Sequence, residues 1–203
     1  MSLLDEAIAA HGGLERWREI SSIEVALRCG GIALPSKGRP RVLRSFRASA
    51  DTRRPHVELH GIGTFDGAQP RPPGMARRLR WRTEDVVHFA GYALWGYLAA
   101  PFVFADEDVR VRELRGRRLE VEFPDRIPAH CRRQTFHFDE HARLRRLDYT
   151  AEVFFGPVAR ARHECHDHTW IDGLLVPVRR RVTPRGLPGP TLVSISIDEL
   201  QAR

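Results

Sequence analysis

Residues 162–183 read RHECHDHTWIDGLLVPVRRRVT, and this stretch decides the fold. Its centre, Asp172-Gly173, is a strong signal for a two-residue hairpin turn, because type I′ turns need positive φ at both central positions. The runs on either side are therefore predicted to pair as antiparallel strands. The turn also fixes the register, with Ile171 opposite Leu174.

This register decides which side chains face the interior. Side chains alternate between the two faces of a strand, so one face combines His163, Cys165 and Asp167 with Arg180 and with apolar residues. We predict that this face is buried. The opposite face is predicted to be solvated, and it carries Glu164, His166, Arg179 and Arg181.

The hairpin belongs to a longer run of strands. Antiparallel strands are predicted at Gln134–Asp139, Leu144–Phe155, Arg162–Ile171, Leu174–Thr183 and Leu192–Asp198. A loop centred near Val158 would place Tyr149 opposite Asp167 and Val153 opposite His163. Alternating apolar residues predict earlier strands at Ile23–Cys29, Val42–Ala48, Val57–Leu59, Ile62–Phe65 and Arg78–Arg82. An apolar sheet face that holds a few polar groups is typical of a small-molecule site.

Residues 86–105 differ from the rest of the chain, because they contain no Asp, Glu, Lys or Arg. The stretch is long enough to span a membrane, but Gly91, Gly96 and Pro101 interrupt it. We expect instead a buried helix over Phe89–Ala99. The predicted fold is α+β and mainly antiparallel β. It is a curved, incompletely closed half-barrel in a single domain, with an N-terminal helix and the central apolar helix covering the concave face.

Composition narrows the possible partners and surroundings. The net charge is +7, but Lys37 is the only lysine and the arginines are spread along the chain, interleaved with acids as at residues 110–115, so no nucleic-acid partner is expected. The three cysteines are far apart, which indicates free thiols in a reducing compartment. No signal peptide is seen at the first residues, so a cytoplasmic location is expected. No organic cofactor is indicated, because no phosphate-binding glycine motif is present.

Several segments together resemble the LolA/LppX-like superfamily of lipoprotein carriers and lipid-binding proteins. These segments are Ala10-His11-Gly12-Gly13-Leu14 before the first strand, Phe136-His137-Phe138-Asp139 with the strand that follows, and Trp170–Pro177. The resemblance implies an open antiparallel barrel whose helices cover an apolar cavity. The chain also resembles a group of uncharacterised bacterial proteins that share His11–Leu14 and Phe89–Trp95. That second resemblance implies no function.

The favoured function is non-catalytic binding of a hydrophobic small molecule, lipid or acyl chain. The candidate ligand-binding residues are Tyr92, Trp95, Tyr97, Phe102, Gln134, Tyr149, His163, Cys165, Asp167 and Arg180. The wall would be formed by Tyr92, Trp95, Tyr97 and Phe102. The polar end would be formed by Arg180, Asp167 and Tyr149, with Arg180 as the anchor for a polar or acidic head group. One alternative is a cofactor-free enzyme with Asp167 or His163 as acid or base. Another is an interaction module whose cavity is filled by Trp95.

The His163–His168 run, HECHDH, also suggests a metal site. His163, Cys165 and Asp167 point to one side of a strand, while His166 and His168 point to the other. One metal therefore cannot use all five residues, and no metal site is expected.

Overall fold

The computed structural model describes residues 1–70, 80–155, 159–186 and 188–203, and within these ranges the strands form one continuous antiparallel sheet. The sheet has eleven strands in the order β4-β3-β2-β1-β11-β10-β9-β8-β7-β6-β5. The strands are β1 (Ser22–Gly30), β2 (Phe46–Asp51), β3 (Val57–Leu59), β4 (Gly63–Phe65), β5 (Arg110–Leu114), β6 (Arg118–Glu122), β7 (Arg133–Phe138), β8 (Leu144–Thr150), β9 (Arg160–Ile171), β10 (Leu174–Pro184) and β11 (Val193–Ala202).

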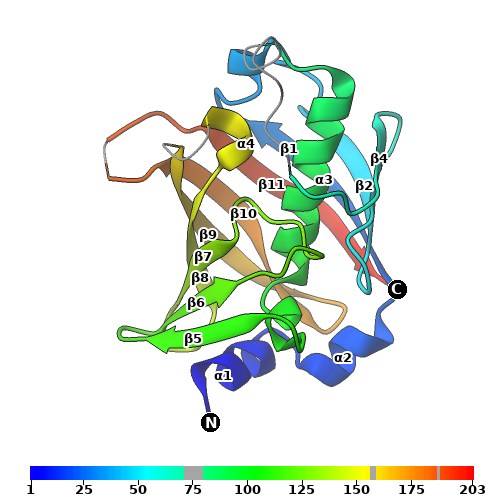
Figure 1. Ribbon diagram of the computed structural model, residues 1–203. Helices are drawn as coiled ribbons and strands as arrows, with labels where there is room; N and C mark the ends of the chain where they lie inside the picture. The colour runs from blue at the N-terminus through cyan, green and yellow to red at the C-terminus, as the bar shows by residue number, and fades with distance from the viewer. Residues whose placement is uncertain (71–79, 156–158, 187) are drawn as a thin grey trace.

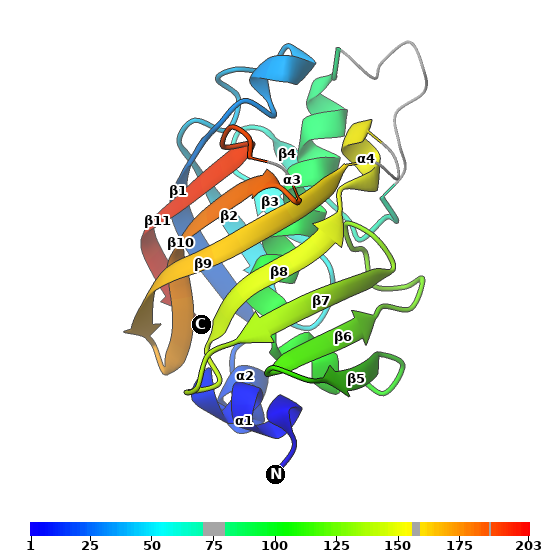
Figure 2. The same ribbon diagram turned by 90° about the vertical axis from the view of Figure 1, so that its left-hand side faces the viewer.

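The sheet is strongly curved and stays open, because the edge strands β4 and β5 do not pair with each other. Helix α3 (Thr83–Ala99) crosses its concave face, and α1 (Leu3–Ala10) and α2 (Leu14–Glu19) lie at one end (Figure 1). Figure 2 shows the convex side, with α3 behind the strands. The short helices are α4 (Glu152–Phe155) and the 3₁₀ turns η1 (Pro35–Lys37) and η3 (Phe102–Ala105). The predicted half-barrel fold class is confirmed.

The predicted hairpin register is confirmed. Ile171 pairs with Leu174 and Cys165 pairs with Arg180. Asp172 and Gly173 have φ of 49° and 82°, as a type I′ turn requires. Arg180 is 4% exposed, whereas its neighbours Arg179 and Arg181 lie in solvent.

The preceding hairpin differs from its prediction. β8 ends at Thr150, because the chain turns there into α4 instead of continuing as a strand to Phe155. Tyr149 consequently pairs with Ala161, not with Asp167. The error in register is an even number of residues, so Tyr149 still faces the interior, where it is buried.

Helix α3 starts earlier than predicted, at Thr83, because the Asp85 carboxylate accepts a hydrogen bond from the Arg82 backbone N–H and caps the first turn. It is buried on nearly all sides, as its apolar sequence predicts. In the described residues, none of the helices is both long and apolar enough to cross a membrane.

Two predicted strands near this helix are wrong in part. Residues 42–45 form turns, and β2 begins only at Phe46. Trp81 lies outside any regular strand, and its backbone N–H donates to the carbonyl of Lys37 at 3.0 Å. Arg78 and Leu79, the start of that predicted strand, lie outside the described residues.

Candidate functional site

Four polar side chains form a hydrogen-bonded group between α3 and the sheet, here called the tyrosine–histidine cluster: Tyr92, Tyr97, His130 and Tyr149. His130 bridges two hydroxyls, with Nδ1 3.2 Å from Tyr92 Oη and Nε2 2.7 Å from Tyr97 Oη. The Tyr97 hydroxyl lies 3.3 Å from that of Tyr149. The Tyr149 ring stacks on His130 with ring centres 4.0 Å apart. The cluster therefore connects the helix, the 123–132 connection and β8.

The cluster is electrically neutral. Burial lowers the pKa of His130 to about 3 and raises the pKa of Tyr97 and of Tyr149 above the ordinary value for tyrosine. At neutral pH each of the three groups keeps its uncharged form. The cluster can exchange hydrogen bonds with a ligand, but it supplies no charge.

Arg180 lies behind this cluster, and its guanidinium binds protein partners. Its guanidinium donates to Cys165 Sγ at 3.3 Å and to the backbone carbonyl of Tyr97 at 2.9 Å. It also lies over the Tyr97 ring, 5.1 Å from the ring centre. Arg180 therefore ties β10 to α3, and its donors toward Tyr97 are occupied.

His163 is fully buried, and neither ring nitrogen has a hydrogen-bond partner. Its ring packs edge-on against Tyr97, with ring centres 4.5 Å apart. Burial, reinforced by the nearby Arg180 charge, holds the pKa of His163 well below its usual range. This residue is an uncharged core side chain.

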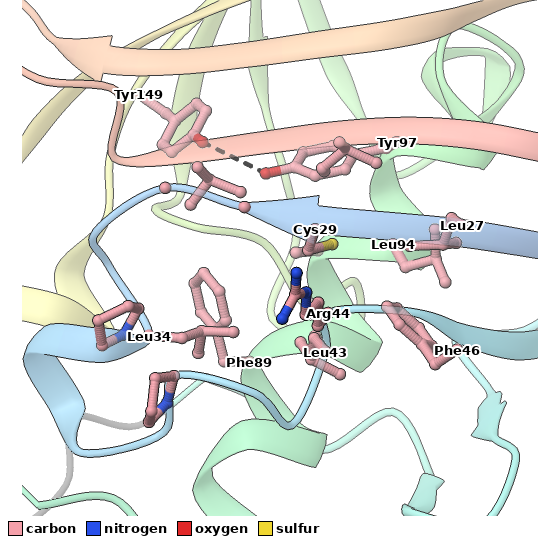
Figure 3. A pocket seen from close by; sticks show the side chains of 18 residues that line it. Leu27, Cys29, Leu34, Leu43, Arg44, Phe46, Phe89, Leu94, Tyr97 and Tyr149 are labelled. Atoms are coloured by element: carbon pink, nitrogen blue, oxygen red, sulfur yellow. Dashed lines mark hydrogen bonds between the residues drawn. The ribbon is translucent and has the colours of Figure 1, made fainter.

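An apolar pocket opens beside the cluster, between α3, the start of β11 and the segment from Leu27 to Phe46 (Figure 3). Its interior volume is about 80 Å³, room for roughly three water molecules at about 30 Å³ each. Aliphatic and aromatic side chains make up most of the wall: Leu27, Leu34, Leu43, Phe46, Phe89, Leu94 and Ile195. We call this space the apolar pocket.

Few polar groups reach the apolar pocket. The Tyr97 and Tyr149 hydroxyls lie along one wall, joined by the hydrogen bond drawn in Figure 3. Burial raises the pKa of the Cys29 thiol to about 12, so it is neutral. Among the described lining residues, Arg44 is the one group that is charged at neutral pH.

The structure brings only some of the predicted site residues together. Tyr97 and Tyr149 line the apolar pocket, and Tyr92 joins them through His130. His163, Cys165 and Arg180 lie nearby but are not part of its lining.

Trp95, Gln134 and Phe102 lie elsewhere. Trp95 does not plug the apolar pocket, because its indole N–H donates to the Asp51 carbonyl at 2.9 Å. Gln134 and Trp95 line a smaller space of about 30 Å³ on another side of α3. The Phe102 ring stacks on Trp17 near α2, with ring centres 4.5 Å apart.

The prediction that Asp167 faces inward is wrong. Asp167 has φ of 53°, outside the extended region, and this local distortion interrupts the strand's alternation. The side chain lies exposed and pairs with Arg179 at 3.2 Å. Asp167 therefore reaches neither the apolar pocket nor Arg180.

His130 is the one member of the tyrosine–histidine cluster that the sequence did not single out. It lies in the connection between β6 and β7, in the sequence Ile127-Pro128-Ala129-His130-Cys131. A histidine inside an apolar run of a connecting segment is a signal that could have drawn attention to it. In the described parts of the chain, no three His, Cys, Asp or Glu side chains are grouped to hold a metal ion.

No family model matches the sequence, and no curated protein matches it. The solved structures with a similar chain trace include two at low sequence identity. One is a LolA superfamily protein from Nitrosomonas europaea, at 14% identity, with a TM-score of 0.45 over 94% of this chain and 91% of that one. The other is a DUF1329 family protein from Desulfovibrio piger, at 12% identity, with a TM-score of 0.49 over 98% and 91%. At these identities and TM-scores the two structures carry no function over to this chain, so its function follows from its own side chains.

Proposed function

We propose that this chain binds a hydrophobic small molecule or acyl chain, without catalysis, in the apolar pocket. The observation that carries the proposal is the pocket itself. It has a mostly apolar wall, it opens beside a neutral hydroxyl pair, and no side chain of α3 fills it. Binding sites for small molecules combine such walls with a few placed polar groups.

The size of the pocket limits the ligand. The present interior of about 80 Å³ suits a slender apolar group. A bulky ligand would have to displace the 31–45 segment, which forms one wall from turns and the 3₁₀ turn η1. An extended alkyl chain needs the least displacement, so it is the best-fitting ligand class.

The two residues that suggested an enzyme, Asp167 and His163, do not line the apolar pocket. Asp167 is exposed and paired with Arg179, and His163 is sealed in the core. A general acid or base must come within hydrogen-bond reach of the substrate. The described lining of the apolar pocket contains no carboxylate and no histidine.

The proposal is tested by fluorescence titration with 1,6-diphenyl-1,3,5-hexatriene, a slender, uncharged dye that brightens in apolar surroundings. Ala90 lines the apolar pocket from α3, and Ala90→Phe should fill it and weaken dye binding about tenfold or more. Phe46→Ala widens the same pocket from the opposite wall and should strengthen binding of the dye.

The matched control is Gly96→Leu, which adds bulk on α3 toward the smaller space and leaves the lining of the apolar pocket unchanged. It should bind the dye as the unmodified protein does. Thermal unfolding of each variant checks that it is folded. Equal dye binding by the folded Ala90→Phe and Phe46→Ala variants would overturn the proposal.

A further inference from the structure

Residues 25–50, which include the segment that lines one wall of the apolar pocket, are unusually basic. They contain no Asp or Glu, but they contain five arginines and Lys37. Partners outside the segment engage most of these cations. Arg28 pairs with Asp198 at 2.7 Å and Arg47 pairs with Glu199 at 2.6 Å.

The remaining members of the segment are placed differently. Lys37 is buried, and Arg39 donates to the Trp81 carbonyl at 2.6 Å. Arg41 and Arg44 are exposed and make no side-chain hydrogen bond or ion pair with any described residue. Of these two, only Arg44 lines the apolar pocket.

The backbone fixes the position of Arg44. Its N–H donates to the Arg41 carbonyl at 3.1 Å, which closes a tight turn. The preceding carbonyl, of Leu43, accepts a hydrogen bond from Cys29 N–H on β1 at 3.1 Å. Leu43 is buried and Arg44 is exposed, so Arg44 lies at the boundary between the core and solvent. Figure 3 shows the Arg44 guanidinium within the ring of lining side chains.

We infer that Arg44 selects ligands that carry an anionic head group, above all a carboxylate on an alkyl chain. This inference rests on the proposed function and names the class of its ligand. A guanidinium presents several N–H donors in a fork that suits a carboxylate. Because no acid lines the described pocket, nothing in it competes for this cation. Arg180, which the sequence suggested for the same role, is already occupied by Cys165 and Tyr97.

The experiment displaces 1,6-diphenyl-1,3,5-hexatriene with three ligands of equal chain length: decanoate, 1-decanol and decylamine. Unmodified protein should bind decanoate about tenfold more tightly than decanol, which equals about 1.4 kcal/mol, and decylamine most weakly. In Arg44→Gln the preference for decanoate should disappear while the affinity for decanol stays the same. Added salt should weaken decanoate binding in the unmodified protein, since the pair lies near solvent.

Arg41→Gln is the matched control, because it removes an exposed arginine of the same turn that does not line the pocket. It should keep the preference for decanoate. Equal affinity for the three ligands in unmodified protein, or a preference that survives Arg44→Gln, would overturn the inference and leave the proposed function standing. Failure of the dye and all three decyl ligands to bind would contradict the proposed function itself.

Discussion

The Tyr97 hydroxyl lies 2.7 Å from Nε2 of His130, while the equally buried His163 ring, packed against the same tyrosine, has no hydrogen-bond partner. Two core histidines therefore differ in what they do for stability. His130 satisfies two tyrosine hydroxyls. His163 has lost its hydration without replacement, which costs free energy.

Replacing each histidine by leucine should have opposite effects. His163→Leu should raise the free energy of unfolding by about 1 kcal/mol, because it removes two unpaired polar atoms from the core. His130→Leu should lower it by about 1–3 kcal/mol, because it leaves the Tyr92 hydroxyl without a partner. Urea unfolding of both variants at pH 7.5 measures this difference. Equal losses in the two variants would show that His163 is satisfied.

The buried histidines should make stability depend on pH. Burial lowers the pKa of His11 to about 4 and of His130 to about 3, against about 6.5 in the unfolded chain. Below pH 6.5 the unfolded chain therefore binds protons that the folded chain does not. The free energy of unfolding is therefore highest above pH 6.5. It falls as the pH drops below 6.5, by about 1.4 kcal/mol per pH unit for each such histidine.

Urea unfolding at intervals between pH 7.5 and 5 measures this slope in a range where most carboxylates stay ionised. The pKa of His163 is also lowered. His163→Leu should therefore remove the contribution of one titrating histidine from the slope, about 1.4 kcal/mol per pH unit. A free energy of unfolding that is constant over this range would contradict the burial of these histidines.

Two glycines of α3 should respond oppositely to alanine. A Cβ at Gly91 would lie 2.2 Å from Cβ of Phe65, so this glycine lets the helix approach β4. A Cβ at Gly96 meets no atom within 4 Å. Gly96→Ala should therefore stabilise the protein by about 0.5–1 kcal/mol, whereas Gly91→Ala should destabilise it by about 1–3 kcal/mol. Thermal unfolding compares them, and a Gly91→Ala variant as stable as Gly96→Ala would contradict the close packing of α3 on β4.

The sole lysine should resist chemical modification. Lys37 is 1% exposed, its ammonium donates to the Phe154 carbonyl at 3.0 Å, and it lies 5.0 Å from the centre of the Phe154 ring. Amine acetylation followed by peptide mass spectrometry should leave Lys37 unmodified in native protein and modify it in 8 M urea. Rapid acetylation in native protein would contradict this burial. Lys37→Met should destabilise the protein by about 1–3 kcal/mol, because the carbonyl of Phe154 loses a donor.

Local signals in the sequence were sufficient to predict most strands of the sheet, although not all of their ends. The Asp172-Gly173 turn set the register of β9 and β10 correctly, because a two-residue turn allows only one pairing. The apolar 86–105 stretch predicted a buried helix, although not its first turn. The expected cytoplasmic location stays a prediction.

The composition of the site could not be predicted to the same extent. Strand alternation predicted an inward Asp167, but a single positive φ places it in solvent. Arg44 and His130 lie in connecting segments, where no periodicity indicates the direction of a side chain. His130 bonds to side chains of α3, and Arg44 lines a pocket that α3 also lines; only the tertiary structure brings these parts together.

The most direct test of the central claim is to locate a bound chain by nuclear magnetic resonance. Protein with ¹³C-labelled leucine and isoleucine methyl groups is mixed with unlabelled decanoate, and intermolecular nuclear Overhauser effects are recorded. The proposed function predicts contacts from the alkyl chain to methyl groups of Leu27, Leu43 and Ile195, which line the apolar pocket. Contacts confined to Leu14, beside the Trp17–Phe102 stack at the other end of α3, would contradict it.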